Sequence, residues 1–310
     1  MTKTSEAMRV DPSLEPSLAS QHIAKDKVTV VIPTLNEAEA ISKIVGEART
    51  EGYRNILVVD GYSTDRTADI ACSMGVEVLH QNGAGKADAV KTAIEHVHTP
   101  YMLFIDGDYT YDPKDIGKLL NHSEQCAHVI GARDRGHMGH LHRLGNWVIS
   151  QVFSVLFEVK LTDVCSGMYL LETEKARRYD LKERGFNIEV ELAAQSALTG
   201  ALTEVNIDYR PRIGVNKLRT WRHGLAILSG LFRLARRYNS GHLYSILAGL
   251  PIIPTLSILC WVAFRQLTEE MGHSGWVLMG IVSLLMAAQA LTLARISVPA
   301  HHSAKRLARK

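Results

Sequence analysis

Short runs of β-branched and other apolar residues alternate with amphipathic segments between residues 28 and 105, and this alternation constrains the fold most. The run VTVVI (28–32) is stopped by Pro33, and apolar residues then recur at helical spacing through residues 38–50. The run at 56–59 begins a second unit, in which Ser63 or Thr64 is expected to cap a helix. Apolar strands that alternate with helices predict an α/β fold, a mostly parallel sheet with helices on both faces.

Polar residues follow the predicted strands. They are Glu37, Asp60, the glycine-containing loop at 82–88, and the pair Asp106 and Asp108. Because ligands bind at the carboxyl ends of parallel strands, we expect these residues along one edge of the sheet.

The segment YMLFIDGDYTYDP (101–113) ends a hydrophobic run with two carboxylates, Asp106 and Asp108. Two carboxylates cannot lie close together unpaired without cost, and a divalent cation relieves their repulsion. Hard oxygen ligands favour Mg²⁺ or Mn²⁺, which can also bridge a diphosphate. An ordinary turn is the alternative, since D-x-D sequences are common in turns.

Three further segments carry cations. The loop GAGKAD lacks both the P-loop and the dinucleotide-binding glycine patterns, so Lys86 is either a phosphate contact at a helix start or a solvated side chain. The segment YRPRIGVNKL (209–218) is either a phosphate clamp or a basic linker beside anionic lipid. The segment RGHMGHLHR (135–143) holds three histidines among arginines, which favours an anion contact or a solvated loop over a metal site.

The C-terminal third differs in composition from the rest. Residues 244–264 and 276–294 are two runs without a charged residue, each about 30 Å long as a helix, which predicts a transmembrane hairpin; two buried core helices are the alternative. Lys and Arg flank the hairpin on its outer sides, which predicts that the soluble part and both termini lie in the cytoplasm. The hairpin also offers a surface for a homo-oligomer.

These features divide the chain into five parts. We expect a flexible tail (1–26), an α/β domain (27–215), a basic amphipathic helix (216–240), the hairpin region (241–298) and a basic tail (299–310). The amphipathic helix is expected in the membrane interface, and packing on the domain is the alternative. The four cysteines show no C-x-x-C spacing, which argues against a zinc site and fits a reducing compartment.

Seven motifs, taken together and in this order, resemble one family. They are VVIPTLNE, VVDGYSTDRT, GKADA, FIDGDYTYDP, DVCSGMYLL, GFNIEVEL and YRPRIGVNKL. Over roughly residues 27–218 the chain resembles the polyprenyl-phosphate (dolichyl-phosphate) glycosyltransferases, inverting enzymes of the GT-A class and family 2 type, related to dolichol-phosphate mannose and glucose synthases.

The resemblance implies a GT-A fold and transfer of a sugar from a nucleotide-sugar donor, with UDP favoured, to a polyprenyl or dolichyl phosphate on the cytosolic leaflet. It implies Mg²⁺ or Mn²⁺ as cofactor and the lipid bilayer as partner, and no nucleic acid. The acceptor phosphate is already an anion at neutral pH, so no strong general base is required.

The resemblance also assigns roles to residues of this sequence. The donor would be bound by Pro33, Asn36, Glu37, Asp60, Lys86, Asp88 and Asp106. The metal would be held by Asp106, Asp108 and Thr110. The catalytic set would be Asp108, Asp163, Arg212 and Lys217, and the acceptor and phosphate contacts Arg133, Arg143, Ser166, Glu189 and Glu191. Gly61-Tyr62 replaces an Asp-Gly pair of many relatives, and Thr110 a Gln of mannosyl relatives, so base and sugar preferences stay open.

Two other functions compete with this reading. A glycosyltransferase with a small soluble phosphorylated acceptor, similar to glucosyl-3-phosphoglycerate synthase, would share the LNE, STD and GK motifs. A catalytically silent membrane scaffold would keep the fold without the chemistry.

Overall fold

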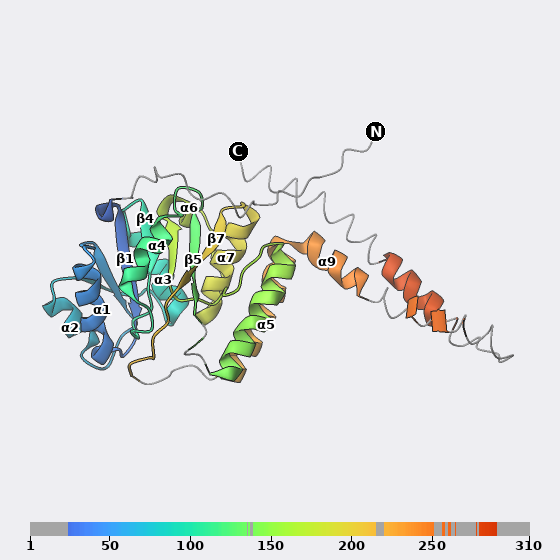
Figure 1. Cartoon of the computed structure of the whole chain (residues 1–310), viewed down its shortest axis with the longest axis horizontal. Coiled ribbons are helices and arrows are strands. Elements are labelled where there is room, and N and C mark those ends of the chain that lie inside the picture. The colour runs from blue at the N-terminus through green and yellow to red at the C-terminus, as the bar shows by residue number, and fades with distance from the viewer. Residues whose placement is uncertain are drawn as a thin grey trace.

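A seven-stranded sheet forms the core of the α/β domain at the left of Figure 1. Its strand order is β3-β2-β1-β4-β6-β5-β7. The computed structural model describes residues 24–134, 136, 139–214, 220–250, 256–257, 260–261, 264, 277 and 279–289. The strands are β1 (Val28–Thr34), β2 (Ile56–Asp60), β3 (Glu77–His80), β4 (Tyr101–Phe104), β5 (His128–Arg133), β6 (Tyr169–Glu172) and β7 (Leu202–Ile207). Only β6 runs antiparallel to its neighbours, so the predicted mostly parallel sheet is confirmed.

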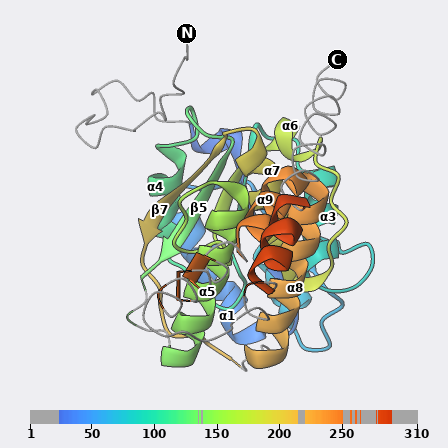
Figure 2. The ribbon, with the colours of Figure 1, turned by 90° about the vertical axis from the view of Figure 1, so that its right-hand side faces the viewer.

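Helices cover both faces of the sheet (Figures 1 and 2). One face packs on α1 (Ala38–Thr50), α2 (Thr67–Ser73) and α4 (Ile116–Leu120). The other packs on α3 (Lys86–His96), α5 (His140–Phe157), α7 (Ile188–Leu198) and α8 (Thr220–Tyr238). Shorter elements are η1 (Lys25–Lys27), η2 (Pro113–Asp115), α6 (Thr173–Ala176) and η4 (Gly185–Asn187), and α9 (Ser240–Gly249) follows α8. Successive strand residues alternate between the two cores, as in Val30 and Val31 of β1.

Helix α1 confirms the predicted helical spacing, since the five apolar residues on which it was based are all fully buried: Ala40, Ile41, Ile44, Val45 and Ala48. The predicted cap of the second helix was wrong. Helix α2 begins at Thr67, whose backbone N–H donates to Asp65 Oδ1 at 2.9 Å. Ser63 instead donates to Asp60, because the chain turns there before the helix begins.

Helix α8 corrects the prediction of a purely interfacial helix. Its apolar residues Leu231, Leu234 and Ala235 are fully buried against the domain, where α8 packs on α5 and α7. For this face, the alternative prediction of packing on the domain is therefore correct, because the face completes the core beside α5 and α7. Leu225 and Phe232, seven residues apart on the outer face, stay 65% and 49% exposed. A membrane contact of this outer face remains a prediction.

Most of the predicted hairpin and both predicted tails lie outside the described residues. From the two apolar runs, the structure describes residues 244–250 and 279–289 together with isolated positions. Among the residues described, no helix combines the length and the apolar character needed to cross a membrane.

His128, on β5, is a buried histidine held neutral. Burial lowers the pKa of His128 to about 3, and the ring Nδ1 lies 2.9 Å from Ser196 Oγ. The unfolded chain takes up this proton below about pH 6.5 and the folded chain does not. The His128 contribution to stability is therefore complete above pH 6.5 and falls by about 1.4 kcal/mol per pH unit below it, down to the folded pKa.

Urea unfolding at pH 7.5, 6.5 and 5.5 checks this. We expect the His128→Gln variant to lose less stability between pH 6.5 and 5.5 than the wild type. Equal losses in the two proteins would contradict the assignment.

Candidate active site

A cavity of about 360 Å³ opens where β1, β2 and β4 end. Its lining is Pro33, Thr34, Leu35, Glu37, Gly61, Gln81, Gly85, Lys86, Ala89, Asp106, Gly107, Asp108, Gly185 and Arg212. Because these strands are parallel, the loops after them converge at one edge of the sheet. The predicted gathering of Glu37, Lys86 and the Asp106–Asp108 pair at this edge is confirmed.

Lys86, the first residue of α3, pairs with two carboxylates. Its Nζ lies 2.6 Å from Asp106 Oδ1 and 2.6 Å from Glu189 Oε1. The Lys86 side chain is only 16% exposed. Burial by itself lowers the pKa of Lys86, but Asp106 and Glu189 outweigh burial and raise it well above its ordinary value. Burial raises the pKa of Glu189, and Lys86 opposes that rise only in part. Lys86 is therefore a fixed cation in the cavity wall.

Arg212, also in the cavity lining, bridges two acidic groups. Its Nη1 donates to Asp108 Oδ2 at 2.7 Å and its Nη2 to Glu37 Oε1 at 2.6 Å. The buried Nε of Arg212 has no hydrogen-bond partner among the described residues. A buried donor without a partner is costly. An anionic ligand that bound this guanidinium would satisfy the donor at little further desolvation cost.

The predicted metal ligands fit a divalent cation that a diphosphate helps to hold. Asp106 and Asp108 both line the cavity, and a Cβ at Gly167 would lie 1.9 Å from Asp106 Oδ2, so glycine is required beside this carboxylate. Two carboxylates plus substrate phosphate oxygens are a typical Mg²⁺ environment. Within the part of the chain that is described, no cluster of three or more His, Cys, Asp or Glu residues could hold a metal without such added ligands.

Thr110, the predicted third metal ligand, contacts the Asp108 carboxylate. Its Oγ1 donates to Asp108 Oδ1 at 2.5 Å and its backbone N–H to the same oxygen at 3.2 Å. Thr110 thereby fixes the Asp108 carboxylate, and direct ligation by Thr110 remains a prediction.

The residues predicted at the nucleoside pocket build the loops of this edge. Asn36 adopts a left-handed φ of 54°, and its Oδ1 accepts from Thr64 N at 2.7 Å. Asp60 is buried and accepts from Ser63 N at 2.9 Å. Asp88 accepts from Ala84 N at 2.9 Å, which closes the glycine loop before α3. Pro33 lines the cavity directly.

Arg133 and Asp163 pair with each other outside the cavity lining. Arg133 donates from Nε to Asp163 Oδ2 at 2.6 Å and from Nη2 to Oδ1 at 2.7 Å, and Asn146 Nδ2 also donates to Oδ1 at 2.8 Å. Burial alone would raise the pKa of Asp163, but Arg133 lowers it below its ordinary value. This pair joins β5 to the loop before β6, and the predicted catalytic and phosphate roles of its members remain predictions.

The other predicted residues are dispersed. Ser166 is buried and its Oγ accepts from Met168 N at 3.3 Å. Arg143 lies in the first turn of α5, with Nη2 2.9 Å from His140 Nδ1. Glu191 is fully buried in α7, where it accepts backbone N–H groups from the loop before that helix. Lys217 and His137 lie outside the described residues.

Three residues near the cavity were missed from the sequence. Gln81 and Gly185 line it, and Tyr169 is buried beside Glu189 and Lys86, whose charges affect its pKa. Burial raises the pKa of Tyr169 well above its ordinary value. Gln81 directly follows the strand-like run VEVLH (76–80) and could have been found by the strand-end rule. Gly185 begins the motif GFNIEVEL, but the roles that the resemblance implies for that motif were assigned to Glu189 and Glu191.

A family model described as glycosyl transferase family 2 matches residues 29–166. The glycosyltransferase AglJ of Haloferax volcanii is 33% identical over 281 residues, which cover 88% of this chain and 93% of that protein. A protein of the same organism named dolichyl-phosphate hexose transferase is 30% identical over 209 residues, which cover 65% of this chain and 91% of that protein.

Solved structures show the same fold. Glucosyl-3-phosphoglycerate synthase from Mycobacterium tuberculosis, in complex with Mn²⁺, UDP and glucosyl-3-phosphoglycerate, superimposes with a TM-score of 0.58 at 18% identity. The superposition covers 67% of this chain and 79% of the synthase.

Proposed function

The chain belongs to glycosyl transferase family 2, and from that premise we propose that this glycosyltransferase moves a sugar from a nucleotide-sugar donor to a polyprenyl or dolichyl phosphate at the cytosolic face of a membrane. The observation that carries the proposal is the cavity at the strand ends, where Asp106 and Asp108 face Lys86 and Arg212. Such a site combines carboxylates for a divalent metal with cations for phosphate groups.

The charges in the cavity suit a donor diphosphate. Asp106 and Asp108 would hold Mg²⁺ or Mn²⁺ against the diphosphate, and the bound metal would stabilise negative charge on the leaving nucleotide. Arg212 would exchange Asp108 for a phosphate oxygen and so supply a positive charge where the acceptor phosphate must approach. Lys86 keeps the Asp106 carboxylate oriented in the cavity. Asp60 and Gln81, at the ends of β2 and β3, would contact the nucleoside.

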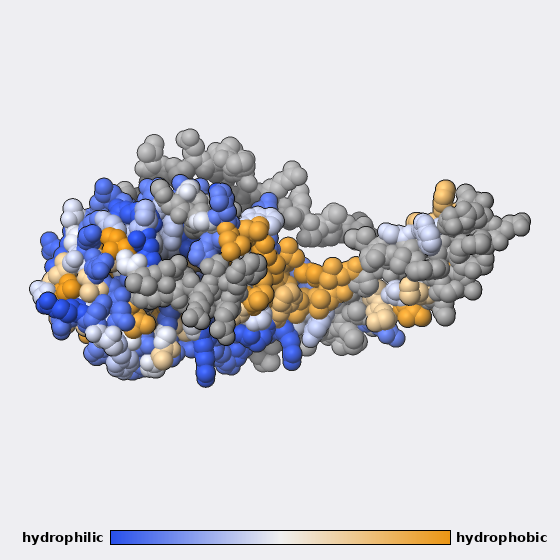
Figure 3. All heavy atoms as spheres, turned by 90° about the horizontal axis from the view of Figure 1, so that it is seen from below, coloured by the Kyte–Doolittle hydropathy of each residue, from blue (hydrophilic) through white to orange (hydrophobic). Residues whose placement is uncertain are grey.

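Exposed apolar side chains support an acceptor in the membrane. Leu141, Leu144, Trp147 and Val155 on α5 are each about half exposed, and their spacing places them on one side of the helix. Tyr244 and Leu247 add exposed apolar surface on α9, and Figure 3 shows hydrophobic side chains gathered where α9 leaves the domain. The name of the dolichyl-phosphate hexose transferase relative agrees with such an acceptor. The predicted hairpin would hold the enzyme at its substrate.

A soluble phosphorylated acceptor is the second candidate. It is favoured by the structural likeness to glucosyl-3-phosphoglycerate synthase, whose structure contains a soluble product. The exposed apolar side of α5 argues against this candidate, because a soluble acceptor requires no apolar surface.

One labelling experiment separates the two. Purified full-length protein is given a radiolabelled UDP-sugar with Mn²⁺ and either polyprenyl phosphate in detergent or 3-phosphoglycerate. We expect label in the lipid fraction only. Label on 3-phosphoglycerate alone would overturn the lipid proposal, and thermal stabilisation by a panel of UDP- and GDP-sugars identifies the donor.

A further inference from the structure

The segment before α7, residues 180–187, contributes Gly185 to the wall of the cavity, and α8 packs against this segment. Gly185 lines the cavity with a left-handed φ of 62°, and the short helix η4 continues from it to Asn187. We propose that α8 positions this wall, with Glu183, Asn187 and Gly230 as positioning residues for donor binding. This inference rests on the proposed function only for the identity of the ligand.

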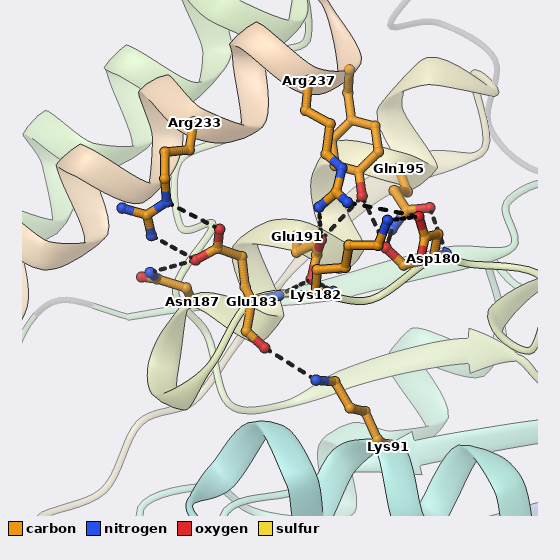
Figure 4. Close-up of polar contacts among 10 residues, drawn as sticks. Lys91, Asp180, Lys182, Glu183, Asn187, Glu191, Gln195, Arg233 and Arg237 are labelled. Atoms are coloured by element: carbon orange, nitrogen blue, oxygen red, sulfur yellow. Dashed lines mark hydrogen bonds and ion pairs between the residues drawn. The ribbon is translucent and has the colours of Figure 1, made fainter. Parts of the chain in front are cut away.

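Glu183 joins four elements at this wall (Figure 4). Its carboxylate Oε2 accepts from Arg233 Nη2 of α8 at 2.8 Å and from Asn187 Nδ2 at 2.9 Å. Its backbone oxygen accepts from Lys91 Nζ of α3 at 3.2 Å, and its backbone N–H donates to Glu191 Oε2 of α7 at 2.8 Å. The Glu183 side chain is 11% exposed, so its orientation is fixed by these partners.

The C-terminal end of α8 makes a second attachment to the same segment. Tyr238 Oη donates to Glu191 Oε1 at 3.0 Å and also reaches the backbone oxygen of Asp180 at 3.0 Å. Arg237 Nη1 lies 3.9 Å from the same Glu191 oxygen (Figure 4). Glu191 is completely buried, and a buried carboxylate that loses its partners is strongly destabilised. Both ends of the segment are therefore coupled to α8.

Helix α8 and η4 approach each other closely at Gly230, whose backbone lies against the Asn187 side chain. A Cβ at Gly230 would lie 2.7 Å from Asn187 Nδ2 and 3.1 Å from its Cγ. An alanine at position 230 must therefore displace the Asn187 amide, which would lose its hydrogen bond to Glu183. Under the proposal, the loss of this hydrogen bond would loosen the segment that carries Gly185, two residues before Asn187.

Two matched pairs of variants test the proposal. Gly230→Ala is compared with Gly224→Ala, because a Cβ at Gly224 meets no atom of the described residues within 4 Å and both changes raise helix propensity. Arg233→Ala is compared with Arg236→Ala, which removes the same charge from an exposed position of α8. The second pair keeps the test decisive where Gly230→Ala does not fold.

The readouts are the affinity for UDP with Mn²⁺ by calorimetry and backbone hydrogen exchange of residues 182–187. We expect Gly230→Ala to weaken UDP binding on the order of tenfold and Arg233→Ala a few-fold, with faster exchange in both. The two control variants should bind and exchange as the wild type does. Equal exchange at residues 182–187 in each variant and its control would overturn the proposal. If the wild type binds no UDP, the proposed donor fails, while the exchange comparison still decides the role of α8.

Discussion

Replacing Asp108 with alanine is expected to lower the rate of sugar transfer by on the order of 10³-fold. The Asp108 carboxylate lines the cavity, and Thr110 fixes one of its oxygens while Arg212 binds the other. Without it, the proposed metal loses one of two carboxylates, and Arg212 loses one of its two ion-pair partners among the described residues and keeps Glu37. Initial rates at saturating UDP-sugar and Mn²⁺ measure the effect.

The control for Asp108→Ala is Asp69→Ala, the same change at an exposed position of α2. This variant should transfer sugar at the wild-type rate. An Asp108→Ala enzyme that retained wild-type activity would refute the metal assignment, whatever the acceptor.

The second large effect is expected when Arg212 is replaced with alanine. The affinity for the metal should rise, whereas the rate of sugar transfer should fall. Arg212 and a divalent cation compete for the same carboxylate, since Nη1 lies 2.7 Å from Asp108 Oδ2. Arg212→Ala should therefore tighten Mn²⁺ binding in the absence of nucleotide by about tenfold, equivalent to about 1.4 kcal/mol. Transfer should fall by about 10²-fold or more, because the guanidinium is then missing from the phosphates.

Calorimetric titration with Mn²⁺ alone and initial-rate measurements test the two halves of this prediction separately. Arg178→Ala, at an exposed position after α6, serves as the matched control and should change neither quantity. Weaker Mn²⁺ binding by Arg212→Ala would show that Arg212 supports the metal site and does not compete with it.

Local sequence pattern predicted the helices and strands around the cavity. The five apolar residues of α1 at helical spacing are all buried, and the polar residues after β1 and β4 meet at the cavity. These features depend on residues close in the chain and on one general rule, that parallel strands end at the same edge of a sheet.

Charge pairs between distant segments could not be predicted in this way. Arg133 and Asp163 were each predicted to contact substrate, and the fold pairs them with each other across 30 residues. Lys86 was predicted as either a phosphate contact or a solvated side chain, and the resemblance placed it in the donor site. The structure adds its two partners, Asp106 and Glu189. A lone charge in a sequence shows that a partner is needed, but only the folded chain shows whether that partner is another side chain.

Helix α8 shows the same division most directly. Its sequence determined an amphipathic helix with one apolar and one basic side, because hydrophobic spacing is a local property. Tertiary structure decided that Leu231, Leu234 and Ala235 pack into the domain and that Gly230 meets Asn187. The sequence thus determined the strand-end carboxylates and their need for positive charge. Only the fold decided that Lys86 and Arg212 provide that charge. Lys86 is 20 residues from Asp106 and Arg212 more than 100 residues from Asp108, so these pairs form only when the sheet has assembled.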